Sequence, residues 1–185
     1  MKLHLGCYQK KIHGFVNVDI RPEVNPDLVS DVFKLPTIKN DSVDLIYACH
    51  VLEHATLTEA YGAFERWNAI LKPNGVLRLA VPDLEAVFDY YRTTGDLQEL
   101  RSFIYGSQKH PYDVHYTGWD FKTLKSDLEK FGFQDVRRYD WRETEHFYID
   151  DYSQCYMPKM AYKSRRVSDR IEGTLLSLNV EAKKV

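Results

Sequence analysis

The sequence predicts an α/β protein in which a mostly parallel β-sheet carries helices on its faces. Short β-rich segments alternate with segments of helical apolar period, and turns rich in Gly, Pro, Asn and Asp separate them. No internal repeat interrupts this alternation. In such sheets, ligands bind beyond the carboxyl ends of the strands, where the strand order reverses. The residues at those ends are therefore the first candidates for a functional site.

The N-terminal part of the chain contains four short segments rich in strand-forming residues. We expect strands over residues 3–5, 15–20, 28–32 and 43–49. The turn Leu35-Pro36 closes the third segment, and Asn40-Asp41-Ser42 precedes the fourth. The fourth segment reads VDLIYAC, an apolar run typical of a strand that is buried on both faces.

The clearest helix signal begins at Thr56. The sequence TLTE, residues 56–59, matches a capping box, in which Thr56 and Glu59 satisfy each other's exposed backbone donors. One apolar stripe of 3.6-residue period follows, made of Ala60, Phe64, Trp67 and Leu71. KPNG, residues 72–75, then ends the helix.

The rest of the chain continues the alternation. We expect a strand over residues 76–82 and a helix that Asp83 caps and that runs to about Arg92. Further helices are expected over residues 97–107 and 121–131, the second ended by Gly132. Strands over residues 134–141 and 174–182 follow, and residues 142–173 between them are polar, aromatic and without an assigned structure.

The composition indicates a single globular domain that spans residues 1–185. Apolar residues make up 44% and charged residues 28%, which is typical of a folded chain with a core. The formal charge of −2 predicts no general attraction to nucleic acid. Three cysteines indicate free thiols in a reducing compartment. With no recognisable signal peptide and no apolar run of about 18 residues, we expect a cytoplasmic protein without a membrane span. The oligomeric state stays open.

The stretch LHLGCYQKKIHGFVNVDI, residues 3–20, has the outline of a nucleotide-cofactor site. A dinucleotide site needs G-x-G-x-x-G and a helix N-terminus for the pyrophosphate, whereas here Tyr8 stands where a second glycine is usual. The crossover is also shorter than the dozen or so residues of a βαβ unit, so its helix is expected to be missing or a single turn. A cofactor without phosphate fits better, with backbone room at Gly6 and ribose hydroxyls bound by Asp19.

Several further segments, in order, resemble the class I S-adenosylmethionine-dependent methyltransferases. They are DLIYACHVLEH, AILKPNGVLRLAVPDLE, HYTGWD, LEKFGF and GTLLSLNVEA. The resemblance reaches from residue 3 to residue 182 and implies S-adenosylmethionine as cofactor. It also implies a doubly wound, mostly parallel seven-stranded sheet of the Rossmann-like methyltransferase fold, with an antiparallel last strand formed by residues 174–182. The family usually has G-C-G at the first turn, and the departure at Tyr8 suggests an alternative, a binding protein without catalysis.

The resemblance places the cofactor at the strand ends, on Gly6, Cys7, Asp19, Asp31, Val32 and His50. In relatives of this type the segment after the third strand lies near the adenine, which implies a contact at Asp31 or Val32. The resemblance also implies that His50, at the tip of the fourth strand, faces the methyl group. Structural interpretations stay open, because Asp19 could cap the turn after it, Asp31 could be a turn acid, and Cys7 could be a small buried residue.

A hydroxyl acceptor benefits from a base that removes its proton, and histidine titrates near neutral pH. His50 and His115 are the candidates, with a purely structural role as the alternative for each. Tyr116 and Trp119 are expected to wall the acceptor site, and residues 150–158 to lie over it. The basic stretch YKSRR, residues 162–166, is either a solvated loop or a site for an acidic group. Similar proteins often accompany surface-polysaccharide genes, so the expected acceptor is a small molecule or a glycan sugar.

HVLEH, residues 50–54, also matches the H-x-x-E-H pattern of zinc peptidases, in which two histidines on one helix bind zinc. A zinc hydrolase built on His50, Glu53 and His54 is therefore a second alternative. That site requires a helix through His50, whereas VDLIYAC predicts a strand there and the helical signal begins only at Thr56. Because no third ligand on a second long helix is evident, we expect no bound metal.

Overall fold

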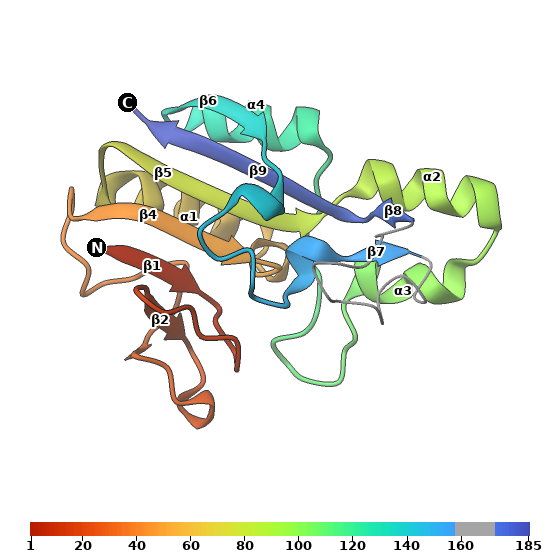
Figure 1. Ribbon diagram of the computed structural model, residues 1–185, viewed down its shortest axis with the longest axis horizontal. Helices are drawn as coiled ribbons and strands as arrows, with labels where there is room; N and C mark the ends of the chain where they lie inside the picture. Colours follow the sequence, from red (N-terminus) through yellow and green to blue (C-terminus); the bar gives the residue numbers. More distant parts are fainter. Residues whose placement is uncertain (158–172) are drawn as a thin grey trace.

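The computed structural model describes residues 1–157 and 173–185. Its main sheet has seven strands in the order β3-β2-β1-β4-β5-β9-β6 (Figure 1). Their bounds are Lys2–Leu5 (β1), Val16–Asp19 (β2), Leu28–Val29 (β3), Val43–Cys49 (β4), Leu71–Pro82 (β5), Phe133–Arg138 (β6) and Ser177–Lys184 (β9). The first five strands of this order, from β3 through β2, β1 and β4 to β5, pair in parallel, and β9 pairs antiparallel with both β5 and β6. The predicted mostly parallel sheet with an antiparallel last strand is confirmed.

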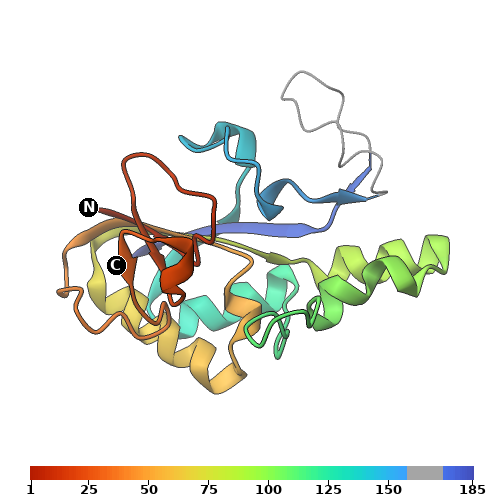
Figure 2. The ribbon, with the colours of Figure 1, turned by 90° about the horizontal axis from the view of Figure 1, so that it is seen from below.

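Two helices cover one face of this sheet. They are α1 (Leu57–Ile70) and α4 (Phe121–Lys130), which Figure 2 shows side by side beneath the strands. The capping box of Thr56 and Glu59 is present at the start of α1, as the sequence predicts. Trp67 of α1 is fully buried, and its indole N–H donates to the Val32 carbonyl at 2.9 Å. This bond ties the helix to the segment that follows β3.

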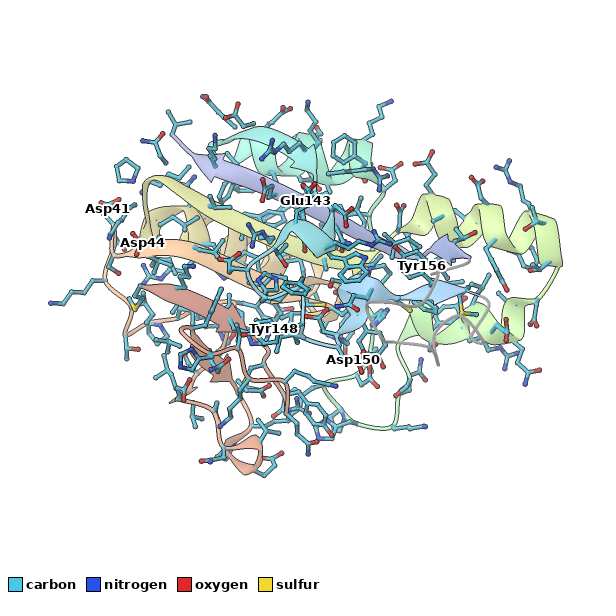
Figure 3. All side chains as sticks on the ribbon, viewed as in Figure 1. Asp41, Asp44, Glu143, Tyr148, Asp150 and Tyr156 are labelled. Carbon is cyan, nitrogen blue, oxygen red and sulfur yellow. The ribbon has the colours of Figure 1, made fainter. Side chains whose placement is uncertain are left out.

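Among the described residues, the chain that covers the opposite face of the sheet contains no α-helix. Side chains alternate along β4, so that Ile46 joins the cluster under α1 while Tyr47 packs with Ile12 and Phe15 of the β1–β2 connection. Two 3₁₀ turns, η3 (Trp141–Glu143) and η4 (Tyr152–Gln154), lie on the same side (Figure 2). This cover follows from the short first crossover, in which residues 6–15 form turns. The described part of the stretch that the sequence left unassigned, residues 142–157, contributes to this cover, since Ile149 packs against the Tyr47 cluster (Glu143 and Tyr148 are labelled in Figure 3).

A helical pair extends from the carboxyl end of β5. It consists of α2 (Leu84–Thr94), whose N-cap is Asp83, and α3 (Leu97–Tyr105) (Figure 1). Its apolar side packs on Cys155, Met157 and Leu176, next to the two-stranded sheet of β7 (Tyr156–Met157) and β8 (Thr174–Leu175). Within the described residues, no helix has the length and apolar character needed to cross a membrane.

Some boundaries differ from the prediction for local reasons. The third strand is only Leu28–Val29, because the Asp31 carboxylate accepts the Phe33 N–H and turns the chain. The last strand divides at Leu176, whose N–H donates to the Cys155 carbonyl instead of continuing the ladder. The basic stretch YKSRR lies outside the described residues.

Candidate active site

The carboxyl ends of β1 and β2 form the first part of the site. Gly6 and Tyr8 both have left-handed backbone, with φ of +64° and +43°. A side chain at Gly6 would place its Cβ 2.3 Å from Val51 Cγ2, so close packing against the end of β4 requires glycine there. Tyr8 keeps the backbone conformation expected of the second glycine, at a cost of roughly 1–2 kcal/mol for a non-glycine residue.

Asp19 ends β2 and is almost fully buried. Its Oδ2 accepts the Tyr8 N–H at 2.9 Å and Arg21 Nη2 at 3.3 Å, and its Oδ1 accepts the Arg21 backbone N–H and Nε at 3.0 and 3.1 Å. Burial raises the pKa of the Asp19 carboxyl, but these bonds outweigh it and the net shift is downward. The charged Asp19 therefore anchors the glycine turn, and its oxygens are shared with Arg21.

The remaining predicted cofactor residues lie along the same edge. Asp31 makes the turn contacts foreseen as its structural alternative, to the Phe33 N–H and to Lys34 Nζ at 2.8 Å. Val32 is buried. Burial raises the pKa of the Cys7 thiol to about 11, so Cys7 is a small protonated side chain and not a nucleophile.

The second part of the site is a cluster at the end of β4, around Glu53. His50 follows the strand directly with left-handed backbone, φ +50°, and its Nδ1 lies 3.1 Å from Glu53 Oε1. Its Nε2 lies 3.3 Å from Ser177 Oγ, and the ring of Tyr152 is centred 5.2 Å from its own. Tyr152, from the segment that the sequence analysis expected over the acceptor site, therefore lies next to His50.

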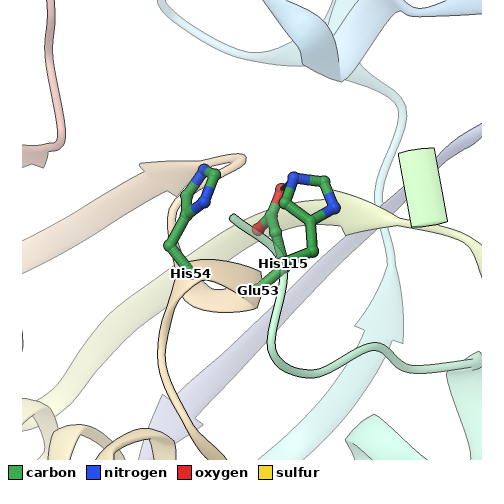
Figure 4. A group of neighbouring side chains, drawn as sticks. All are labelled: Glu53, His54 and His115. Atoms are coloured by element: carbon green, nitrogen blue, oxygen red, sulfur yellow. Dashed lines mark ion pairs between the residues drawn. The ribbon is translucent and has the colours of Figure 1, made fainter. Parts of the chain in front are cut away.

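Glu53 belongs to the 3₁₀ turn η2 (Leu52–His54) and is fully buried. His115 comes from the loop between α3 and α4, and its Nε2 lies 4.0 Å from Glu53 Oε1. Burial raises the pKa of the Glu53 carboxyl, but the three neighbouring histidines outweigh it and the net shift is downward. Burial lowers the pKa of His115, with Glu53 acting in the opposite direction. A carboxylate with imidazoles on several sides is the chemical core of this cluster (Figure 4).

The sequence and the fold are both similar to those of known methyltransferases. Residues 9–79 match a family model described as a methyltransferase domain. An S-adenosylmethionine-dependent methyltransferase from Archaeoglobus fulgidus is 17% identical, with a TM-score of 0.59 over 99% of this chain and 85% of that one. The chain shares the fold of S-adenosylmethionine-dependent methyltransferases of known structure, and its residues 9–79 match the methyltransferase-domain model.

Two further solved structures share the fold. A possible methyltransferase of this type from Listeria monocytogenes is 16% identical, with a TM-score of 0.56 over 100% of this chain and 90% of that one. A possible histamine N-methyltransferase from Thermotoga maritima is 12% identical, with a TM-score of 0.59 over 100% of this chain and 82% of that one. None of the curated proteins matches the sequence. S-adenosylmethionine is the cofactor that the family implies.

The strand-end residues fit that cofactor in one respect and require a rearrangement in another. The turn at Gly6 and Tyr8 has the tight left-handed backbone of a cofactor loop. Asp19 lies at the end of β2, where a ribose-binding carboxylate is expected, but Arg21 now occupies both of its oxygens. The side chain of Arg21 packs over the Tyr8 ring at 4.9 Å, so the two side chains would move together.

One expectation on an individual residue needs revision, and the predicted strand before His50 is confirmed. Trp119 does not wall a site, since it is buried in the main core and its indole N–H donates to Asp127. The helix that a zinc-peptidase motif needs does not pass through His50, because β4 runs to Cys49 and only η2 follows. Sequence reasoning treated Glu53 and His54 only as parts of that motif. The signal that marks them is the polar HVLEH directly after a buried strand.

Proposed function

We propose that this methyltransferase transfers the methyl group of S-adenosylmethionine to a hydroxyl group of a small molecule or a surface-glycan sugar. The observation that carries the proposal is the contact between the two parts of the site. Val51 packs against the Gly6 turn, and it lies between His50 and Glu53 in the sequence. The turn proposed to hold the cofactor and the histidine–carboxylate cluster are therefore neighbours.

The cofactor would be held along the strand ends. Gly6 and Cys7 would supply backbone to it, Asp19 would accept ribose hydroxyls once Arg21 moves away, and Asp31 with Val32 would flank the adenine. S-adenosylmethionine supplies a methyl group already activated by its positive sulfur. The chain then has to align an acceptor oxygen opposite the carbon–sulfur bond and exclude water.

The acceptor proton is proposed to pass to a histidine of the cluster as the oxygen–methyl bond forms. His50 Nδ1 and His115 Nε2 both approach Oε1 of Glu53, at 3.1 and 4.0 Å. Glu53 would hold the imidazole in place and stabilise the imidazolium that results, as the carboxylate does in other acid–base pairs. The proton ends on the histidine, and the bonding pair of the broken carbon–sulfur bond ends on sulfur.

Exposed aromatic rings around these two parts support a sugar-like acceptor. Tyr116, 61% exposed, donates its N–H to the Glu53 carbonyl, and Tyr152, 53% exposed, lies against His50. Tyr8, 47% exposed, sits above Asp19. Aromatic faces with a polar edge are common linings of sites that bind amphipathic ligands such as sugars.

The first test is cofactor binding, by titration calorimetry with S-adenosylmethionine and S-adenosylhomocysteine. We expect both to bind, and an Asp19→Ala variant to bind more weakly than an Asp89→Ala control, whose side chain is exposed on α2. No heat and no thermal shift at millimolar ligand would contradict the proposal. A screen of glycans and small alcohols for methyl transfer then tests the acceptor class.

A further inference from the structure

The cluster around Glu53 contains three side chains of the types that bind metal ions. One ligand atom each of Glu53, His54 and His115 lies within 4.8 Å of the others (Figure 4). We propose that Glu53, His54 and His115 bind a divalent transition-metal ion, with coordination positions left open for the oxygen of the acceptor. The acceptor role rests on the proposed function, whereas metal binding itself does not.

The two imidazoles are oriented as in metal sites. His54 Nδ1 lies 3.1 Å from the Val114 carbonyl, and His115 Nδ1 lies 3.0 Å from the Phe103 carbonyl. A carbonyl only accepts, so each Nδ1 carries the hydrogen and each Nε2 keeps its lone pair. Metal-binding histidines characteristically donate their other N–H to such a partner, which fixes the ring and its tautomer.

Glu53 is the independent observation that points to a ligand. Its side chain is 0% exposed, and within the described part of the chain neither carboxylate oxygen receives a hydrogen bond of acceptable geometry. His50 Nδ1 approaches Oε1 at 3.1 Å, which leaves Oε2 without a partner among those residues. Buried charges in proteins are usually paired or bound to metal. A cation between Glu53 and the two Nε2 atoms would satisfy this carboxylate.

The backbone holds the three ligands together before any ion arrives. The N–H groups of Tyr116 and Thr117 donate to the Glu53 carbonyl at 2.9 and 3.3 Å, and the Thr117 hydroxyl donates to the Ala55 carbonyl at 3.0 Å. The loop that carries His115 is thus joined to η2, which carries the other two ligands. Two ligands on one ion stand at most roughly 4 Å apart, so the cluster needs to close by less than about 1 Å.

The donor set indicates the kind of ion and its use. Two imidazoles and one carboxylate suit zinc, iron or manganese, and three protein ligands leave positions open as in catalytic sites. An acceptor hydroxyl bound there would lose its proton more readily. His115 would then be a ligand, which leaves His50 as the base. This proposal replaces the expectation of no bound metal, which rested on the absence of a helix through His50 and His54 and on the lack of a third ligand on a second long helix. His115 supplies that ligand from a loop and not from a helix.

The test is metal binding to the full chain, free of chelator, by calorimetry with Zn²⁺, Mn²⁺ and Co²⁺ and by the visible spectrum of the Co²⁺ form. We expect one ion per chain, without the charge-transfer bands of cobalt–thiolate bonds. Glu53→Gln and His115→Gln should weaken binding by about tenfold or more, since even outer partners of metal ligands cost this much. The control is His13→Gln, which changes an exposed histidine outside the cluster.

Glu53→Gln keeps the side-chain volume, and its circular dichroism and melting curve report whether the fold survives. Failure to bind any of the three ions, equal binding by wild type, Glu53→Gln and His115→Gln, or thiolate bands would each overturn the metal site. The proposed function is judged separately by S-adenosylhomocysteine binding. A chain that binds this cofactor product and transfers methyl groups in excess chelator keeps the proposed function and loses the metal inference.

Discussion

Acid should destabilise this protein through His146, a buried histidine on the face of the sheet opposite α1. Its side chain packs on Tyr47 with ring centres 4.1 Å apart, and among the described residues its Nδ1 has no hydrogen-bond partner. Burial, followed by the positive charge of Arg78, lowers the pKa of His146 to about 4, against the opposing effects of Asp151 and Glu145. Between about pH 4 and pH 6.5, His146 is therefore mostly neutral in the folded chain and mostly protonated in the unfolded chain.

The sign and size follow from linkage. The pKa of His146 is lower in the folded state than its ordinary 6.5, so its contribution to stability is complete above about pH 6.5 and is lost as pH falls towards 4. The full difference is 6.5 − 4 = 2.5 pKa units, or about 3 kcal/mol, of which about 2 kcal/mol is lost by pH 5. That is a large part of the usual 5–15 kcal/mol for a domain.

The assay is urea unfolding at pH 7.5 and pH 5, comparing wild type with His146→Phe, which keeps a ring against Tyr47. We expect the variant to lose about 2 kcal/mol less than wild type between these two pH values. His13→Phe, a change at an exposed histidine, should behave as wild type. If His146→Phe loses as much stability as wild type at pH 5, burial of this histidine is not the cause of acid sensitivity.

Three further outcomes are expected. Asp19→Ala should weaken S-adenosylhomocysteine binding by roughly 1.5–3 kcal/mol in calorimetry, and an unchanged Kd would remove Asp19 from the cofactor site. His50→Ala and His115→Ala should each lower turnover about a hundredfold or more, while the affinity for S-adenosylhomocysteine stays within about threefold of wild type. If both variants keep normal turnover, neither histidine is the base, and catalysis consists of aligning the acceptor with the methyl group. Gly6→Ala should lower the free energy of unfolding in urea more than Gly14→Ala does. Both glycines have positive φ, but only the Cβ added at position 6 would meet a neighbouring side chain, Val51 Cγ2 at 2.3 Å.

Local features of the fold were predictable because a few neighbouring residues determine them. The capping box at Thr56 and the cap at Asp83 depend on side chains within three residues, and both form as predicted. The alternation of strands and helices then leaves few arrangements of a parallel sheet. The missing first helix was also predictable, since the chain between β1 and β2 is too short to hold one.

Long-range contacts of the site were not predictable in the same way. The approach of His115 to Glu53 depends on how the loop before α4 folds back onto η2, and no local pattern encodes that path. The ion pair of Arg21 with Asp19 was likewise hidden, although the two residues are close in sequence. Arg21 occupies the Asp19 oxygens that would bind ribose only because of the geometry of this turn, and the sequence alone does not give that geometry.

Backbone strain at the strand ends connects the fold with the proposed function. Tyr8 and His50 both have positive φ, a conformation that histidine adopts more readily than tyrosine but that is uncommon for any residue other than glycine. Both follow the carboxyl end of a parallel strand, Tyr8 after β1 and His50 after β4, and these strands pair directly. Strained residues persist only where surrounding structure enforces them, and they concentrate at functional sites. The sheet thus holds in place the two residues that flank the proposed point of methyl transfer, one on the cofactor turn and one at the base.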